Sequence, residues 1–154
     1  HAKDYNVDPE RLGICGASAG GPLSLMRGTT GKDGDPKAKD PVDREASRVA
    51  AVACFFPPTD FLNYGKDGEV ALGTGTLAGF RPPFDFWERD PKTGSLTVIA
   101  DEEKRRAIGR RVSPAYLVTK ESAPALVIHG DADKLVPIQQ AEVLGAAYRR
   151  AGVA

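Results

Sequence analysis

The feature that most limits how this chain folds is a short apolar run followed at once by a glycine-rich turn around one serine. The run 11–15 (Arg-Leu-Gly-Ile-Cys) has the length and composition of a buried strand, and the turn 16–21 (Gly-Ala-Ser-Ala-Gly-Gly) follows it directly. A helix-compatible segment, 18–27, comes next, with Pro22 in a first turn that tolerates proline. The sequence therefore predicts a strand, a sharp turn and a helix in direct succession.

The spacing Gly-x-Ser-x-Gly gives this turn a chemical meaning. A sharp strand-to-helix turn holds its serine in a strained conformation, so that the hydroxyl of Ser18 projects above the sheet as a nucleophile. We expect Gly16 and Gly20 to leave room for the backbone and for close helix packing. The helix N-terminus and the backbone N–H of Ala19 would stabilise a developing oxyanion. An idle serine in a glycine-rich turn is the alternative, and the strand–turn–helix context argues against it.

Two further apolar runs, 49–55 and 125–129, have the length and near-continuous hydrophobicity of strands covered on both faces. Helices are expected over 101–112, which begins with acids and ends with arginines, and over 139–151, which carries one apolar stripe and is followed by Gly152. Strands that alternate with helices predict an α/β fold with a parallel sheet.

Two stretches lack such patterns. Residues 31–44 are dense in Gly, Asp, Lys and Pro, which predicts an exposed loop. Residues 61–100 mix aromatic side chains with glycines and prolines, and a segment this long is expected to be a lid or insertion. Its aromatic residues either line a substrate pocket or form the insertion's own small core, and the sequence leaves both interpretations open.

The segment 7–21 resembles the approach to the nucleophile in α/β-hydrolases, and the similarity extends through 56–61, 113–115 and 129–137. It is most similar to carboxylesterases of the acetyl-xylan or feruloyl esterase type and to the related prolyl-oligopeptidase-like hydrolases. The resemblance implies a three-layer αβα parallel sheet. Residues 1–154 would then be a partial α/β-hydrolase domain in which N-terminal strands and the last strand are missing.

The resemblance also assigns the acid of a catalytic triad to a loop that follows a late strand. Asp133 occupies that place in the Asp-x-x-Val-Pro pattern, where it would orient an imidazole and stabilise its charged form. Asp131 lies nearer the strand and is expected to brace the loop through backbone N–H groups. Asp60 follows the middle strand, and a loop-capping role is expected for it. Asp133 is the favoured acid, with the other two as competitors.

The sequence offers no clear candidate for the histidine that would act as the base of this triad. Of the two histidines, His129 is expected to be structural, and His1 precedes Ser18, which is the wrong order. In the resembling enzymes the histidine follows one more strand, and part of the oxyanion hole comes from an early His-Gly-Gly-type loop that the sequence does not contain before Ser18. We therefore expect the chain alone to have little or no hydrolase activity.

The function expected from these features is a serine hydrolase that cleaves carboxylic esters through an acyl-enzyme on Ser18 in a full-length parent protein. A prolyl-oligopeptidase-like serine peptidase and a non-catalytic binding protein with a hydrolase fold are the alternatives. The expected partner is a small-molecule ester, with acylated carbohydrate as one class. No cofactor and no metal are expected, because the sequence contains no metal-ligand cluster and no nucleotide-binding glycine loop.

Composition excludes little else. The chain has 21 basic and 21 acidic side chains, and this balance gives no reason to expect a nucleic-acid partner. The longest apolar stretch, 49–56, is too short to span a membrane. Cys15 and Cys54 each lie in a strand-like run and are expected to be buried free thiols. Neither the compartment nor the oligomeric state follows from the sequence.

Overall fold

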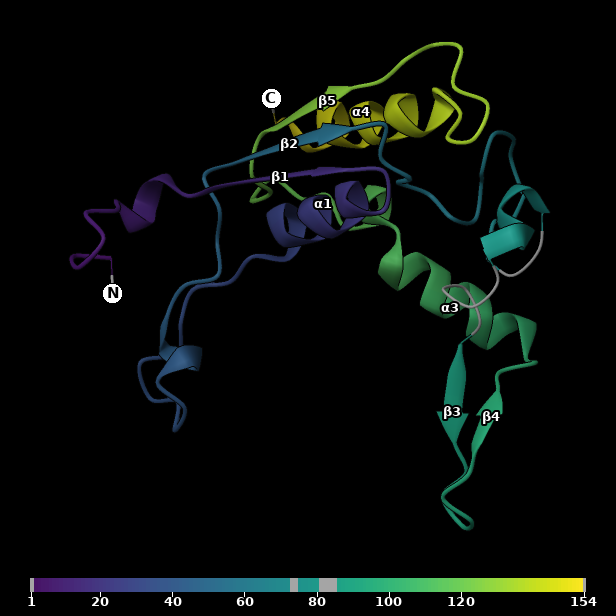
Figure 1. The fold of residues 1–154 in the computed structure, drawn as a ribbon, viewed down its shortest axis with the longest axis horizontal. Coiled ribbons are helices and arrows are strands. Elements are labelled where there is room, and N and C mark those ends of the chain that lie inside the picture. The colour runs from purple at the N-terminus through teal and green to yellow at the C-terminus, as the bar shows by residue number, and fades with distance from the viewer. Residues whose placement is uncertain (1, 73–74, 81–85, 154) are drawn as a thin grey trace.

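The computed structural model describes residues 2–72, 75–80 and 86–153, and its centre is a three-stranded parallel sheet (Figure 1). The strand order is β1-β2-β5, so that each of the three predicted runs forms a strand and the predicted parallel pairing is confirmed. The strands are β1 (Gly13–Ala17), β2 (Ala51–Phe55) and β5 (Ala125–Ile128).

Three helices lie where the sequence places them. α1 spans Gly20–Thr30, α3 spans Glu102–Val112 and α4 spans Gln139–Ala151. Asp101 caps α3, because its carboxylate accepts hydrogen bonds from two backbone N–H groups of the first turn. Gly152 ends α4 in the left-handed conformation with φ 70°. Local capping chemistry therefore sets these helix ends.

The two faces of the sheet differ. Val52 and Cys54 face α1 and α4, where they form a core with Leu25, Leu144 and Tyr148. On the opposite face the exposed side chains include Phe55 at 42%, Leu126 at 60% and Ile128 at 48%. The described residues thus form two layers, with their sheet-packed helices on one face, and the third layer of the expected αβα arrangement stays a prediction.

The region 61–100 has a core of its own. Phe61, Leu62, Tyr64, Ala71, Leu72 and Leu77 form a buried cluster, and Phe86 packs against it. The strands β3 (Trp87–Arg89) and β4 (Leu96–Val98) pair as an antiparallel hairpin that projects away from the sheet (Figure 1).

The aromatic residues of this region are not all part of its core. Phe61 and Tyr64 belong to the local core, whereas Phe80 and Trp87 are about half exposed, at 49% and 56%. Phe84 lies outside the described residues.

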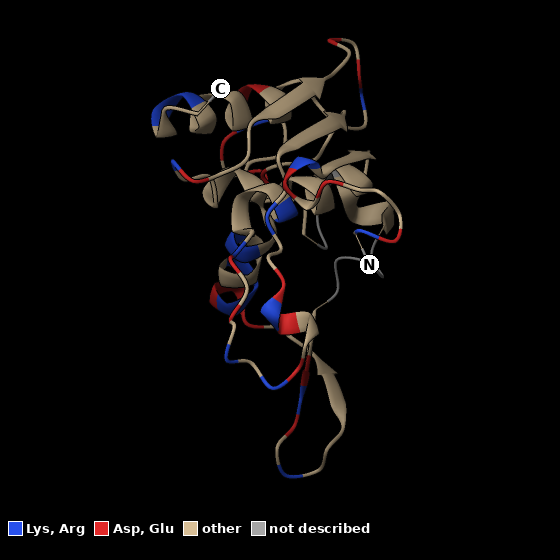
Figure 2. Cartoon of the chain, turned by 90° about the vertical axis from the view of Figure 1, so that its left-hand side faces the viewer, with Lys and Arg blue, Asp and Glu red and all other residues tan. Residues whose placement is uncertain are grey.

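Charge is kept off the central sheet. The strands β1, β2 and β5 carry no Lys, Arg, Asp or Glu, and Figure 2 shows charged residues of both signs on the loops and on α3 and α4. The predicted exposed loop 31–44 is one such charged segment and contains a short 3₁₀ helix, Val42–Arg44. No helix in the described part of the chain is both long enough and apolar enough to cross a membrane.

Candidate functional site

Ser18 lies in the sharp turn between β1 and α1, and its backbone has the strained conformation that the sequence predicts. Its φ is 49°, in the left-handed region that non-glycine residues rarely adopt. The N–H of Ser18 donates to the carbonyl of Phe55 at 3.0 Å, and the Ser18 carbonyl accepts from the N–H of Gly21 at 2.9 Å. Hydrogen bonds on both sides of the residue thus hold the strained backbone in place.

The glycines around Ser18 have different roles. A Cβ at Gly16 would lie 2.2 Å from the carbonyl oxygen of Gly20, so no other residue fits without a backbone shift. A Cβ at Gly20 would meet no described atom within 4 Å, whereas one at Gly21 would lie 2.6 Å from the Cβ of Pro57. The expectation for Gly16 is confirmed, but close helix packing requires Gly21 rather than Gly20.

The three parallel strands bring their carboxyl ends to one edge. Ala17 pairs with Phe55, and Phe55 pairs with Ile128, so the residues that follow these three are neighbours across the sheet. Phe56 is the neighbour of Ser18, with φ 38°, a side chain 37% exposed and an N–H that donates to the Ile128 carbonyl. The sequence analysis missed Phe56, because no motif marks a left-handed residue at a strand end.

Asp133 lies on the loop that follows β5, at the same edge of the sheet. Its Oδ1 accepts hydrogen bonds from the N–H groups of Leu135 and Val136, both at 2.9 Å. These two hydrogen bonds hold the pKa of the Asp133 carboxyl below its usual value, and the one from Val136 has the larger effect. Oδ2 lies 3.9 Å from Nε2 of His129 and accepts no hydrogen bond from the described residues. The carboxylate therefore keeps one oxygen for a further donor.

The competing acids are arranged differently. Asp60 is buried, and its two oxygens accept hydrogen bonds from the N–H groups of Leu62 and Asn63, from the Asn63 side chain and from the hydroxyl of Tyr116. This is the loop-capping role expected for Asp60. Asp131 is exposed, and the loop bracing that the sequence analysis assigned to it is performed by Asp133 instead.

His129 is engaged inside the loop. Its side chain is 2% exposed, and Nε2 lies 2.7 Å from the carbonyl oxygen of Val136, the geometry of an N–H donor. Nδ1 is buried and has no partner among the described residues. This arrangement agrees with the structural role expected for His129. His1, the second histidine of the sequence, lies outside the described residues.

Ala19 precedes the first residue of α1, at the positive end of the helix dipole. Its backbone N–H has no acceptor among the described residues. The described residues therefore leave this N–H able to donate to a further acceptor beside Ser18.

Gln140 is a second residue that the sequence analysis missed. Its side chain is fully buried, and Oε1 accepts hydrogen bonds from the N–H groups of Thr59 and Asp60 at 2.7 and 2.8 Å. It fixes the loop after β2 to the start of α4. A polar residue on the buried face of an amphipathic helix is a signal that would have identified it.

The comparisons of this chain with known proteins agree with one another on its family. The family model BD-FAE matches residues 1–148. The chain is 28% identical over 141 residues to the probable carboxylic ester hydrolase LipM of Mycobacterium tuberculosis, covering 92% of this chain and 28% of LipM. It is 31% identical over 137 residues to Esterase LipC of the same organism, covering 89% of this chain and 30% of LipC. The chain thus spans about three-tenths of the length of these curated relatives.

Solved structures agree on the fold. An acetyl ester-xyloside bifunctional hydrolase from Caldicellulosiruptor lactoaceticus superposes with a TM-score of 0.73 at 24% identity, over 98% of this chain and 46% of that chain. A truncated carbohydrate esterase from gut microbiota gives a TM-score of 0.68 at 26% identity, over 99% of this chain and 51% of that chain. The family match, the curated relatives and the parallel sheet agree, and the chain belongs to the BD-FAE family of α/β-hydrolase esterases.

Proposed function

We propose that Ser18 is the nucleophile of a carboxylic ester hydrolase, in a longer protein of which this chain is a part. The observation that carries the proposal is the φ of 49° at Ser18, because a strained non-glycine residue between a strand and a helix is the backbone geometry of a nucleophile turn. Membership of an esterase family supports the reaction class.

In the proposed reaction, Oγ of Ser18 bonds to the ester carbonyl carbon while a histidine takes the hydroxyl proton. The carbonyl oxygen becomes an oxyanion, to which the N–H of Ala19 donates a hydrogen bond. The C–O bond to the alcohol then breaks, and the same histidine returns the proton to the departing alcohol. Water, activated by that histidine, releases the acid and restores Ser18.

Asp133 is the proposed partner of this histidine. Its ionised carboxylate is fixed through Oδ1, and Oδ2 is the oxygen that would accept the imidazole N–H. His129 is a poor base, because its Nε2 is used by the Val136 carbonyl and its ring is buried. We propose that another part of the full-length protein supplies the base, as it would supply a second oxyanion donor.

We propose acylated carbohydrate as the substrate class. Two solved structures at 26% identity support this class: a truncated carbohydrate esterase from gut microbiota and a bifunctional GH43-CE protein of Bacteroides eggerthii. Region 61–100 is proposed to be an insertion within the domain that acts as a lid. Its own buried core supports this proposal.

Hydrolysis of p-nitrophenyl acetate by the full-length protein tests the function. Ser18→Ala should lower kcat at least about a thousandfold, because it removes the nucleophile. Ser47→Ala, on the loop before β2, is the matched control and should leave turnover unchanged. Full activity in Ser18→Ala would end the proposal.

Two further measurements make this test more specific: one compares substrates, and the other compares the 154-residue chain with the full-length protein. Release of acetate from acetylated xylan supports the carbohydrate class, whereas cleavage of peptide substrates alone would favour a peptidase. The 154-residue chain by itself should turn over p-nitrophenyl acetate far more slowly than the full-length protein, since Nε2 of His129 is used by the Val136 carbonyl and His1 precedes Ser18 in the sequence. Equal turnover would contradict that expectation.

A further inference from the structure

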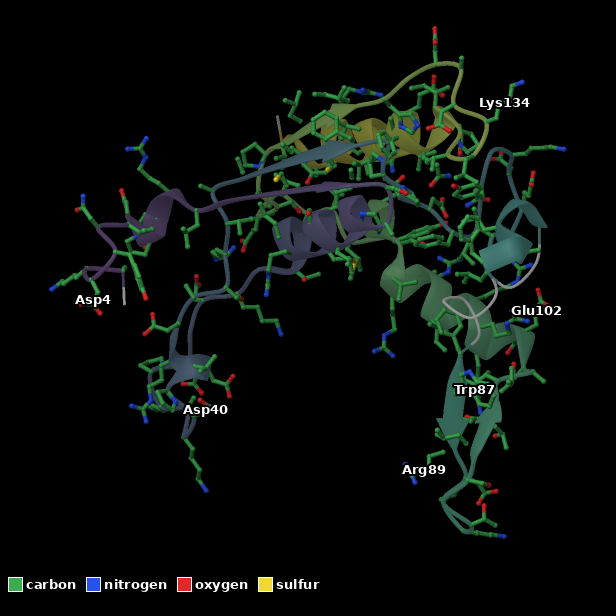
Figure 3. The ribbon with its side chains drawn as sticks, in the orientation of Figure 1. Asp4, Asp40, Trp87, Arg89, Glu102 and Lys134 are labelled. Carbon is green, nitrogen blue, oxygen red and sulfur yellow. The ribbon has the colours of Figure 1, made fainter. Side chains whose placement is uncertain are left out.

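Tyr64 connects the proposed insertion with the loop that holds Asp133. Its ring is fully buried in the core of region 61–100, and its hydroxyl donates to the carbonyl oxygen of Leu135 at 2.9 Å. Residue 64 and residue 135 are 71 positions apart in the sequence. Figure 3 labels Lys134 on the same loop, next to Leu135, with its side chain pointing outward from the end of the sheet.

The peptide that Tyr64 contacts is also the one that holds Asp133. The carbonyl of Leu135 and the N–H of Val136 belong to a single peptide group, and that N–H donates to Oδ1 of Asp133 at 2.9 Å. A hydrogen bond to the carbonyl of a peptide polarises the group and strengthens the bond made by its N–H. The hydroxyl of Tyr64 therefore acts on the Asp133 carboxylate through one planar unit.

The backbone on either side of Tyr64 is fixed as well. The carbonyl of Asn63 accepts hydrogen bonds from the side chains of Gln139 and Gln140, both at 3.0 Å. The N–H of Gly65 donates to Oε1 of Gln139 at 3.1 Å. Since both glutamines stand at the start of α4, the tyrosine is anchored to the helix that follows the Asp133 loop.

We infer that Tyr64 is a positioning residue for the Asp133 carboxylate, and that region 61–100 contributes in this way to the catalytic acid. The inference rests on the proposed function. Val136, whose N–H is the one that Tyr64 strengthens, is also the largest cause that holds the pKa of Asp133 low. A tyrosine at this place keeps the acid ionised and its Oδ2 directed at the incoming imidazole.

Tyr64→Phe in the full-length protein tests the inference, since it removes the hydroxyl and keeps the ring. Tyr148→Phe is the matched control: Tyr148 is also buried and donates to a backbone carbonyl, that of Ala123 at 3.1 Å, in the other core. We expect Tyr64→Phe to lower kcat about three- to tenfold with little change in KM, the effect of weakening one hydrogen bond. Tyr148→Phe should leave kcat unchanged.

The pH profile separates positioning from a merely structural loss. A less firmly held Asp133 stabilises the protonated imidazole less, so the acid limb of kcat/KM in Tyr64→Phe should move to lower pH by about 0.3 unit or more. A loss of stability alone would lower the profile without moving this limb. An unmoved limb, or equal kcat in the two tyrosine variants, overturns the inference.

A second measurement does not need turnover. Tyr64→Phe and Asp133→Ala are combined, and the loss in denaturant midpoint is compared with the sum of the single losses. We expect the double variant to lose less than the sum, whereas Tyr148→Phe with Asp133→Ala should be additive. Additive losses in both pairs overturn the inference.

Two further variants separate a failure of the proposed function from a failure of the role of Tyr64. If Ser18→Ala keeps full turnover, the proposed function fails. If Asp133→Asn keeps full turnover, the assignment of the acid to Asp133 fails, and the role of Tyr64 fails with it. If both variants lose turnover while Tyr64→Phe behaves like Tyr148→Phe, only the role of Tyr64 fails.

Discussion

The turn around Ser18 and the loop around Asp133 lie at the same edge of the sheet but are held by different means. Ser18 is held by the conformation of its own backbone, which has a positive φ. The turn also requires glycine at position 16, because the Gly20 carbonyl leaves no space there for a side chain. Asp133 is placed by hydrogen bonds, two of its own and others that reach its loop from Tyr64 and His129. The position of Ser18 therefore depends on steric fit, whereas that of Asp133 depends on a network of hydrogen bonds.

This difference explains why the two are not equally visible in the sequence. Steric fit requires glycine at fixed spacing, so a short motif was enough to identify the Ser18 turn. A network includes residues from distant segments, and Tyr64 or Gln140 carries no local signal for its role. The comparison therefore predicts different responses to substitution in the two places.

Asp133→Asn should have the largest effect of the substitutions that separate the two regions. An amide at this position leaves the histidine without a charged partner and favours the wrong tautomer, so kcat should fall about a thousandfold or more. Asp131→Asn is the control on the same exposed loop and should change kcat less than about twofold. Steady-state kinetics on an ester substrate measure both, and reversed effects would assign the acid to Asp131.

Gly16→Ala tests the steric side of the comparison. The new Cβ would meet the carbonyl of Gly20 at 2.2 Å, so the turn must shift and kcat should fall about a hundredfold. Gly20→Ala places its Cβ in open space and should keep kcat within about twofold. Gly20→Ala is a matched control, because Gly16 and Gly20 are the two glycines of the same Gly-x-Ser-x-Gly motif. Equal losses in the two variants would show that the described contacts do not set the turn.

Acid titration tests the network side. The pKa of Asp133 is lower in the folded protein than in the unfolded chain, so its contribution to stability is present above about pH 4 and is lost as the pH falls through the folded value. The gap in unfolding free energy between the protein and Asp133→Ala should thus be constant above about pH 5 and narrow below about pH 4. Chemical denaturation at a series of pH values measures it. A gap that widens on acidification would contradict the hydrogen-bond arrangement.

We expect the smallest effect at Trp87, which lies neither in the turn around Ser18 nor in the loop around Asp133. Its side chain is 56% exposed on the projecting hairpin, where Figure 3 labels it with Arg89. Trp87→Ala should change the free energy of unfolding by less than about 0.5 kcal/mol. A rise in KM with an unchanged kcat would support substrate contact by the insertion, and an unchanged KM would argue against it.

Much of the fold follows from local sequence. The predicted strands 49–55 and 125–129 end where the structure ends them or one residue later, and the helix 139–151 agrees at both ends. Near-continuous hydrophobicity predicted the two strands, and an apolar stripe followed by Gly152 predicted the helix. The first strand was placed two residues early, because Arg11 belongs to a 3₁₀ turn, Pro9–Arg11, capped by Asp8.

The hairpin of β3 and β4 was missed, although its turn carries a signal. Oδ1 of Asp90 accepts hydrogen bonds from the N–H groups of Lys92 and Thr93, and Gly94 has φ 73°. An aspartate followed by a glycine four residues later, between short runs of strand-forming residues, is typical of such a turn. Glycines and prolines in the surrounding region obscured it.

The role proposed for Ser18 is tested most directly by identifying the serine that becomes covalently modified. The full-length protein is treated with a fluorophosphonate, digested with trypsin and analysed by tandem mass spectrometry. We expect one adduct on Ser18, within the peptide 12–27, and none on Ser24 of the same peptide, whose hydroxyl donates to the Gly20 carbonyl. Modification at another serine, or none in an enzyme that turns over esters, would contradict this expectation.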